Sequence, residues 1–181
     1  MTHRFQQKPG LDFTNTYSPT ILYRAIGIIL AKAAAEDKEI TQLDMVTALL
    51  ESRSNEGLYL KLPKHFIISG DGRVKLKMEQ PSGKAKKPER QVIIKLKRNL
   101  YGLKQAGHNW YHTLKSHSIE WMEMKLSLYE ADIYFSQTGA MIIACVDDLL
   151  RIGTKREVEE MKNRINEHFQ IKNLGNVKRF L

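Results

Sequence analysis

Apolar residues recur along this chain in two patterns, one typical of helices and one typical of buried strands. A helical period follows Pro19 and fades at Glu36-Asp37-Lys38, which predicts a helix there. A second helix is expected over Lys104–Met124. A third begins after Thr154 and Glu157, which have the spacing of a capping box, and is expected to end near Asn173 and Gly175. The apolar positions that define these helices are Leu22, Ile26, Ile29, Leu30 and Ala33, then Trp110, Leu114 and Trp121, then Val158, Met161, Ile165 and Phe169.

Short apolar runs bounded by turn residues predict strands between the helices. A Thr138-Gly139 turn is expected to join two of them, Asp147-Asp148 is expected to form another turn, and a final strand is expected to begin at Val177. Strands and helices alternate irregularly, which indicates an α+β fold with a mostly antiparallel sheet. The predicted strands are residues 58–62, 92–96, 134–136, 141–146 and 149–152, and the apolar run 40–50 is interrupted by Asp44.

Charge is concentrated in one part of the chain. The 181 residues have a formal net charge of +9, and the window from Lys75 to Arg98 holds nine Lys or Arg against two Glu. Two interpretations stay open, a solvated surface loop and a contact to nucleic-acid phosphates.

The single cysteine, Cys145, excludes an intrachain disulfide and indicates a reducing compartment. Neither a membrane span, nor a secretory leader, nor any other targeting signal is visible.

Two adjacent carboxylates, Asp147 and Asp148, interrupt the most apolar segment of the chain. Carboxylates ~4 Å apart repel by ~4 kcal/mol at an effective dielectric of ~20. An acidic hairpin turn that is open to water tolerates this repulsion, and a divalent cation would neutralise it. Asp44 also interrupts an apolar run, and buried charges are rarely left unpaired. Three such carboxylates would make an all-oxygen site for Mg²⁺, the type of site that drives phosphoryl transfer.

Several blocks, in order, resemble the reverse transcriptase domain of copia-type LTR retrotransposons. The most specific is Leu96-Lys-Arg-Asn-Leu-Tyr-Gly-Leu-Lys-Gln-Ala106, followed by Trp110-Tyr111. Gln42-Leu-Asp-Met-Val-Thr-Ala-Leu-Leu50 resembles the first metal-binding motif of the family, and Cys145-Val-Asp-Asp148 resembles its "Y-V-D-D". Weaker matches are Phe5–Phe13, Tyr17-Ser-Pro19, Gly57-Leu-Tyr-Leu60 with Pro63, Glu130-Ala-Asp132, and Asn173-Leu-Gly175 with Phe180-Leu181.

The resemblance implies a palm-and-fingers polymerase core over residues 1–181, with an antiparallel palm sheet backed by helices. Both ends are expected to be truncated and the thumb to be missing, and residues 67–90 are expected to form an irregular basic loop. The implied activity is RNA-directed DNA polymerisation. The implied partners are an RNA or DNA template-primer and deoxynucleoside triphosphates, with no membrane, and the sequence does not indicate an oligomeric state. Localisation in the cytoplasm, the nucleus or both is expected.

The resemblance also implies roles for particular residues. Asp44, Asp147 and Asp148 would be catalytic and, with the backbone of Met45, would bind two Mg²⁺ ions, for which Mn²⁺ could substitute. Gln105 and Leu49 would bind the nucleotide. Contacts to nucleic acid are expected from Cys145, Lys95, Lys97, Arg98 and Lys104.

Some positions depart from the family pattern. Cys145 stands where the family has Tyr, Leu49 stands where it has an aromatic residue that excludes a ribose hydroxyl, and Gly107-His108 replaces Pro-Arg. Cys145 is then either a small buried residue or a weakened primer contact. His108 and His112 have helical spacing, but no Cys or third His stands at a suitable distance for zinc.

Three hypotheses follow. The chain is an active reverse transcriptase domain, or an inactive remnant that binds only metal or nucleic acid, or an unrelated nucleic-acid-binding module. The intact aspartates favour the first. The truncated ends predict that the isolated chain is weakly active or inactive, because positioning of the template-primer supplies much of the catalysis in phosphoryl transfer.

Overall fold

The computed structural model describes residues 7–54, 57–62, 66–68, 74–76 and 93–177. The chain divides into two compact units. The larger unit comprises Met1–Arg53 and Arg98–Leu181, and the smaller unit comprises Ser54–Lys97. No helix among these described residues is long and apolar enough to cross a membrane.

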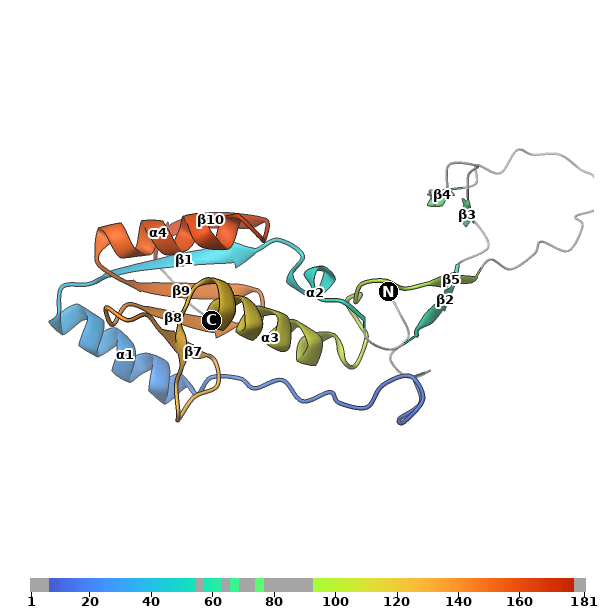
Figure 1. Ribbon diagram of the computed structural model, residues 1–181, viewed down its shortest axis with the longest axis horizontal. Coiled ribbons are helices and arrows are strands. Elements are labelled where there is room, and N and C mark those ends of the chain that lie inside the picture. The colour runs from blue at the N-terminus through green and yellow to red at the C-terminus, as the bar shows by residue number, and fades with distance from the viewer. Residues whose placement is uncertain (1–6, 55–56, 63–65, 69–73, 77–92, 178–181) are drawn as a thin grey trace, which may run out of the picture. The chain divides into compact units, whose positions relative to one another are not determined.

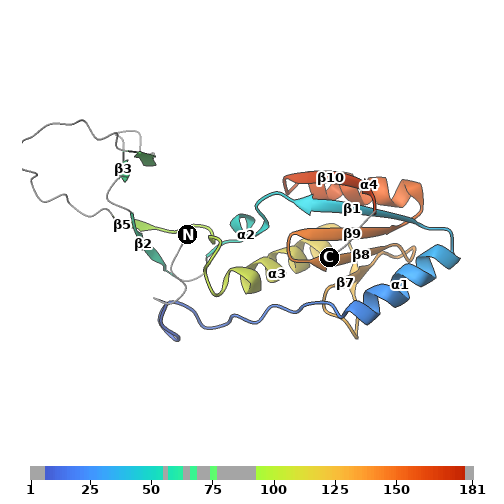
Figure 2. The same cartoon turned by 180° about the vertical axis from the view of Figure 1, so that it is seen from behind.

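A six-stranded sheet forms the centre of the larger unit, in the order β10-β1-β9-β8-β7-β6. Every neighbouring pair in this sheet is antiparallel, as the sequence predicts. Figure 1 shows β1 running between β10 and β9, and Figure 2 shows the same arrangement from behind. The strands are β1 (Glu39–Met45), β6 (Lys125–Leu126), β7 (Ile133–Phe135), β8 (Met141–Cys145), β9 (Asp148–Gly153) and β10 (Ile171–Asn176).

Helices cover both faces of this sheet because its central strands are apolar on both faces. Helices α3 (Ala106–Ser116) and α4 (Lys155–Asn166) pack on one face, in a core that includes Leu43 and Leu149. Helix α1 (Tyr23–Ala35) packs on the opposite face, in a core that includes Leu150 and Ile152. The two faces therefore have separate cores, and neighbouring residues of one strand contribute to different ones.

The smaller unit contains two short antiparallel pairs. Strand β2 (Tyr59–Lys61) pairs with β5 (Ile93–Lys95), and β3 (Phe66–Ile68) pairs with β4 (Val74–Leu76). The expectation of an irregular loop over residues 67–90 is therefore wrong where β3 and β4 lie, because all but one of their residues are apolar, several of them of the β-branched and aromatic types that favour strands. The rest of that range, residues 69–73 and 77–90, lies outside the described residues.

The capping box is confirmed, and it starts α4. The Thr154 side chain accepts a hydrogen bond from the Glu157 backbone, and the Glu157 carboxylate accepts one from the Thr154 backbone N–H at 2.7 Å. The predicted end of this helix is wrong. Helix α4 ends at Asn166, and the segment expected to terminate it is strand β10. Pairing with β1 stabilises β10 although its sequence lacks alternation.

A single helix was predicted over Lys104–Met124. The α-helix observed there is shorter than predicted and ends differently. Helix α3 stops at Ser116, and a π-helix, η2 (His117–Trp121), continues it. The Met122 N–H donates to the His117 carbonyl five residues earlier, which changes the rotation of the following residues about the axis. Trp121 is consequently 60% exposed and does not share the buried face of Trp110 and Leu114.

Candidate active site

Asp44 lies near the end of β1, directly opposite Asp148 of the neighbouring strand β9. Its chain neighbours Leu43 and Met45 point into the core shared with α3 and α4. Because side chains alternate along a strand, Asp44 points to the other face of the sheet. Residues opposite each other on antiparallel strands share a face, so the two carboxylates are neighbours on one surface.

Asp147 belongs to the tight turn between β8 and β9. Its carbonyl accepts a hydrogen bond from the Met45 backbone N–H at 2.7 Å, which joins the turn to the end of β1. The Trp110 indole of α3 donates to the Val146 carbonyl at 2.7 Å. The turn is thus held from both sides. The prediction that Asp148 is itself a turn residue is wrong, because Asp148 is the first residue of β9.

Burial raises the pKa of the Asp147 carboxyl above its usual range. A hydrogen bond from Tyr101 lowers the pKa in part, and the charges of Asp44 and Asp148 raise it further. The Tyr101 hydroxyl lies 3.4 Å from Asp147 Oδ2. The other oxygen, Oδ1, is buried and has no hydrogen-bond partner within the described part of the chain. Asp147 therefore carries a partly buried charge that its surroundings leave incompletely neutralised.

Asp148 has polar neighbours on both adjacent strands. The Gln42 side-chain amide of β1 donates to Asp148 Oδ1 at 2.9 Å. On β8, Cys145 lies opposite Asp148 in the register. Burial raises the pKa of the Cys145 thiol, and the charges of Asp148 and Asp132 raise it further. The thiol is therefore kept in its neutral form. Cys145 is half-buried, so its role as a small buried residue or as a primer contact stays a prediction.

The donor set fits a hard divalent cation in chemistry and in backbone placement. Asp44 and Asp148 come from the adjacent strands β1 and β9, and Asp147 comes from the turn between β8 and β9. The buried Oδ1 of Asp147 has no hydrogen-bond partner among the described residues. The side chains of these three aspartates do not converge, however. No group of three or more His, Cys, Asp and Glu side chains is arranged to hold a metal ion in the ranges that the structure describes. Mutual repulsion favours this separation when no cation is bound.

Comparison with known proteins identifies the family. The family model described as "Reverse transcriptase (RNA-dependent DNA polymerase)" matches residues 1–77 and 70–181, which together span the chain. The chain belongs to the reverse transcriptase family. The resemblance found in the sequence is thereby confirmed. No solved structure matches the chain.

Relatives of this reverse transcriptase sequence are polyproteins of retrotransposons. It is 30% identical to the retrovirus-related Pol polyprotein from transposon TNT 1-94 of Nicotiana tabacum, covering 98% of this chain and 12% of that polyprotein. It is 28% identical to the retrovirus-related Pol polyprotein from transposon RE1 of Arabidopsis thaliana, covering 98% of this chain and 11% of that polyprotein. It is 30% identical to the transposon Ty1-DR4 Gag-Pol polyprotein of Saccharomyces cerevisiae, covering 95% of this chain and 10% of that polyprotein. The chain spans about a tenth of the length of these curated relatives.

Gln105, predicted to bind the nucleotide in this reverse transcriptase, is fully buried. Its side-chain amide donates to the Asp12 carbonyl at 3.2 Å, and its Oε1 accepts from Gln7 at 2.9 Å. Lys104 is held by the same N-terminal segment, because its Nζ lies 4.8 Å from the Phe13 ring centroid. The segment before α1 therefore encloses Gln105, and the role of Gln105 stays a prediction.

Leu49 lies in the short helix α2 (Ala48–Glu51) and packs partly buried against the core shared with α3 and α4. Thr47, with φ of 56°, turns the chain between β1 and this helix. The sharp turn places α2 directly after the strand that carries Asp44. The role of Leu49 in sugar discrimination is a prediction that this placement leaves untested.

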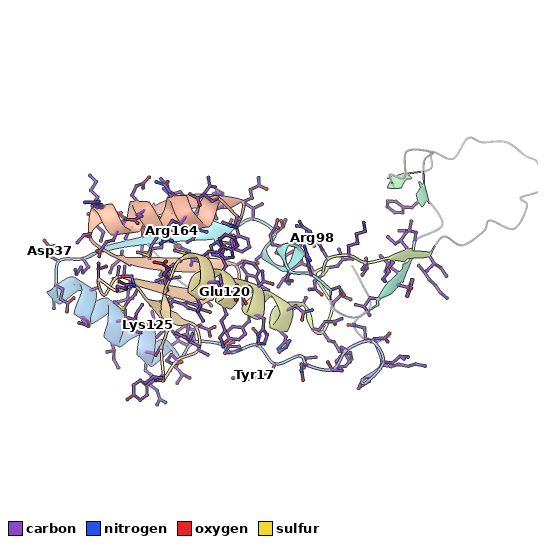
Figure 3. All side chains as sticks on the ribbon, in the orientation of Figure 1. Tyr17, Asp37, Arg98, Glu120, Lys125 and Arg164 are labelled. Carbon is purple, nitrogen blue, oxygen red and sulfur yellow. The ribbon has the colours of Figure 1, made fainter. Side chains whose placement is uncertain are left out.

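The predicted nucleic-acid contacts fall in both units. In the larger unit, Arg98 forms an ion pair with Glu51 of α2 at 2.7 Å, and Figure 3 labels Arg98 beside that helix. In the smaller unit, Lys95 of β5 and the nearby Lys97 are exposed. Exposure leaves both lysines available to phosphates. The Arg98 guanidinium is partly neutralised by its acidic partner.

Two residues that contact the aspartates, Gln42 and Tyr101, were not predicted as site residues from the sequence. A signal for Gln42 was available, since it stands two residues before Asp44 in a predicted apolar run, and such residues share one face of a strand. Tyr101 offered no comparable signal. It reaches Asp147 from a loop 46 residues earlier in the chain, and only the folded structure shows this approach.

Proposed function

We propose that this chain carries the nucleotidyl-transfer centre of a copia-type retrotransposon Pol polyprotein, with Asp44, Asp147 and Asp148 as its catalytic carboxylates. The register of β1 and β9 supports the proposal most directly, because it pairs Asp44 with Asp148 beside the Asp147 turn. Residues about a hundred positions apart in the sequence are neighbours in the sheet. The same three positions are those that the resemblance to the family selects.

The carboxylates would serve as ligands for divalent cations. Two Mg²⁺ ions, or Mn²⁺ in their place, would supply Lewis-acid activation of a primer hydroxyl and charge neutralisation at the nucleotide phosphates. Asp147 is suited to this task because its buried Oδ1 lacks a hydrogen-bond partner among the described residues. The Met45 backbone lies close by, since its N–H bonds the Asp147 carbonyl.

The substrates would be a template-primer of RNA or DNA and deoxynucleoside triphosphates. In this proposal the six-stranded sheet with its helices is the palm, and the smaller unit with its exposed Lys95 and Lys97 belongs to the fingers. Exposed cations favour phosphate backbones without selecting a sequence. The template-primer would therefore be held mainly by charge, and its binding would weaken with salt.

Primer extension tests the proposal. The measurement is Mg²⁺-dependent nucleotide addition to a primed RNA template by the 181-residue chain, by its Asp147→Asn variant and by Glu39→Gln. Glu39 is a matched control because it lies on the same strand as Asp44 but opposite Gly153, which has no carboxylate. Extension that Asp147→Asn abolishes and Glu39→Gln preserves is the expected result for an active centre.

An inactive remnant that binds only metal or nucleic acid is the second candidate. The enclosure of Gln105 favours it, because that amide is already bonded to Gln7 and Asp12 and is fully buried. Absence of extension by the unsubstituted chain, together with salt-sensitive binding of the template-primer, would support the remnant and contradict the active centre.

A further inference from the structure

The two oxygens of the Asp147 carboxylate lie in different surroundings. Oδ2 is 3.4 Å from the Tyr101 hydroxyl, which donates to it. Oδ1 is buried and has no partner in the portion of the chain that the structure describes. The Tyr101 contact therefore distinguishes one oxygen from the other, and Oδ1 is the oxygen that receives no hydrogen bond from the described residues.

Asp148 has a corresponding donor on the neighbouring strand. The Gln42 amide lies 2.9 Å from Asp148 Oδ1. Gln42 and Asp44 are two residues apart on β1 and share a face of the sheet, so the amide and the opposing carboxylate approach Asp148 from the same strand. The adjacent aspartates thus each receive one hydrogen bond from an uncharged side chain.

We propose that Tyr101 and Gln42 are positioning residues that orient the carboxylates of Asp147 and Asp148 for a divalent cation. This inference rests on the proposed function of the site. An unrestrained carboxylate rotates about its terminal bond and must be ordered when a cation binds. A donor fixed to one oxygen removes part of that ordering cost and directs the other oxygen. Groups that hold metal ligands in this way typically change metal affinity about 10- to 100-fold when they are substituted.

A purely stabilising role explains the Tyr101 contact less well. Tyr101 is 44% exposed, and its hydroxyl donates to Asp147 Oδ2 at 3.4 Å. Such a bond contributes little to the free energy of unfolding. Neither Tyr101 nor Gln42 adds charge to a site that already contains three carboxylates. Orientation is the effect that both donors share.

Mn²⁺ binding to the full 181-residue chain tests the proposal. Free Mn²⁺ is measured by electron paramagnetic resonance for Tyr101→Phe, which removes one hydroxyl, and for Gln42→Met, which removes the amide at similar length. The matched controls are Tyr129→Phe and Gln137→Met, whose side chains are exposed. Asp147→Asn reports whether binding depends on the site, and urea unfolding without metal reports any loss of structure.

The expected result is Mn²⁺ affinity about 10- to 100-fold weaker in Tyr101→Phe and Gln42→Met, with metal-free unfolding midpoints equal to those of the controls. Affinities equal to the controls would overturn the positioning role and leave the proposed function intact. A lowered metal-free midpoint that accounts for the weaker binding would overturn it in favour of a structural role. If the unsubstituted chain showed no Asp147-dependent binding, both the proposed function and this inference would fail.

Discussion

Asp44 of β1 and Asp148 of β9 stand directly opposite each other on two interior strands of the sheet. Like charges in this cross-strand position destabilise a sheet. The adjoining Asp147 feels both charges, which raise the pKa of its carboxyl beyond the effect of burial. Asp44 and Asp148 share one face of the sheet although their side chains and that of Asp147 do not converge.

Substitution of Asp44 by Asn is expected to stabilise the chain when no metal is present. Removing one of two opposed carboxylates should raise the free energy of unfolding by roughly 0.2–1 kcal/mol, a gain that loss of the pairing of Asp44 with Lys172 of β10 offsets in part. Urea unfolding in the presence of a chelator measures this change. Glu39→Gln, on the same strand and opposite Gly153, should leave the free energy of unfolding nearly unchanged.

Added Mg²⁺ should reverse the order of stability. The unsubstituted chain is expected to gain stability with increasing Mg²⁺ because a bound cation stabilises the folded state, whereas Asp44→Asn should gain much less. Equal gains in both proteins would show that Asp44 does not contribute to cation binding.

Val146, beside the aspartates in the β8–β9 turn, has a φ of 51°. A β-branched residue rarely adopts this left-handed conformation, which costs about 1–2 kcal/mol. Glycine adopts it freely but loses about 0.5–1 kcal/mol in conformational entropy. Val146→Gly is therefore expected to raise the free energy of unfolding by up to about 1 kcal/mol, as measured by urea denaturation.

Val46 offers the control for this prediction, because it is not among the residues of positive φ. Val46→Gly should lower the free energy of unfolding. A loss of stability in Val146→Gly as large as that in Val46→Gly would mean that the turn is not strained at Val146.

The sequence predicted the elements whose signals are local. The capping box of Thr154 and Glu157 places the start of α4 correctly, and the helix after Pro19 and the strand over residues 141–146 both occur. Strand β10 could not be predicted in the same way. Its residues Ile171–Asn176 do not alternate, and its conformation depends on pairing with β1, more than a hundred residues earlier.

The residues of the candidate site could be selected from the sequence only where their signal is local. Asp44, Asp147 and Asp148 interrupt apolar runs, and a charge within such a run can be recognised in the sequence. The approach of Tyr101 to Asp147 depends on how a loop packs against a turn, and so does the enclosure of Gln105 by Gln7. Side-chain contacts between loops have no periodic pattern in a single sequence.

Asp132 is 6% exposed, and burial together with the charge of Glu130 raises the pKa of its carboxyl to about 6. Its folded-state pKa lies above its ordinary value of 3.8, so the folded chain binds this proton more tightly than the unfolded chain. Stability is therefore lost as the pH rises from about 4 to about 6. Asp132→Asn should stabilise the chain by roughly 2 kcal/mol at pH 7.5 and have little effect below pH ~4.

Urea unfolding at pH 4 and pH 7.5 measures this difference. Asp37→Asn is the matched control, since Asp37 is an exposed aspartate with φ of 52° and Asn tolerates that conformation equally well. A gain for Asp132→Asn that is the same at both pH values would contradict the raised pKa.

His117 is buried in η2, and neither ring nitrogen has a hydrogen-bond partner in the described ranges. Burial, together with the charges of His168 and Arg164, lowers the pKa of its imidazole from 6.5 to about 4. The unfolded chain therefore binds this proton more tightly. Stability that is present above pH ~6.5 is lost as the pH falls towards 4. The ring packs against Phe169 with centroids 4.8 Å apart, so Phe is a substitution that suits the site.

His117→Phe should remove roughly 2–3 kcal/mol of the acid-induced loss of stability. The measurement is the free energy of unfolding in urea at several pH values between 7.5 and 4.5, where the variant should show a flatter dependence than the unsubstituted chain. His168→Gln, which replaces an exposed neighbour of the ring, should keep most of the original slope. If His117→Phe retained the full slope, the pKa of His117 would be the same in the folded and unfolded chain, and the lowered pKa would be contradicted.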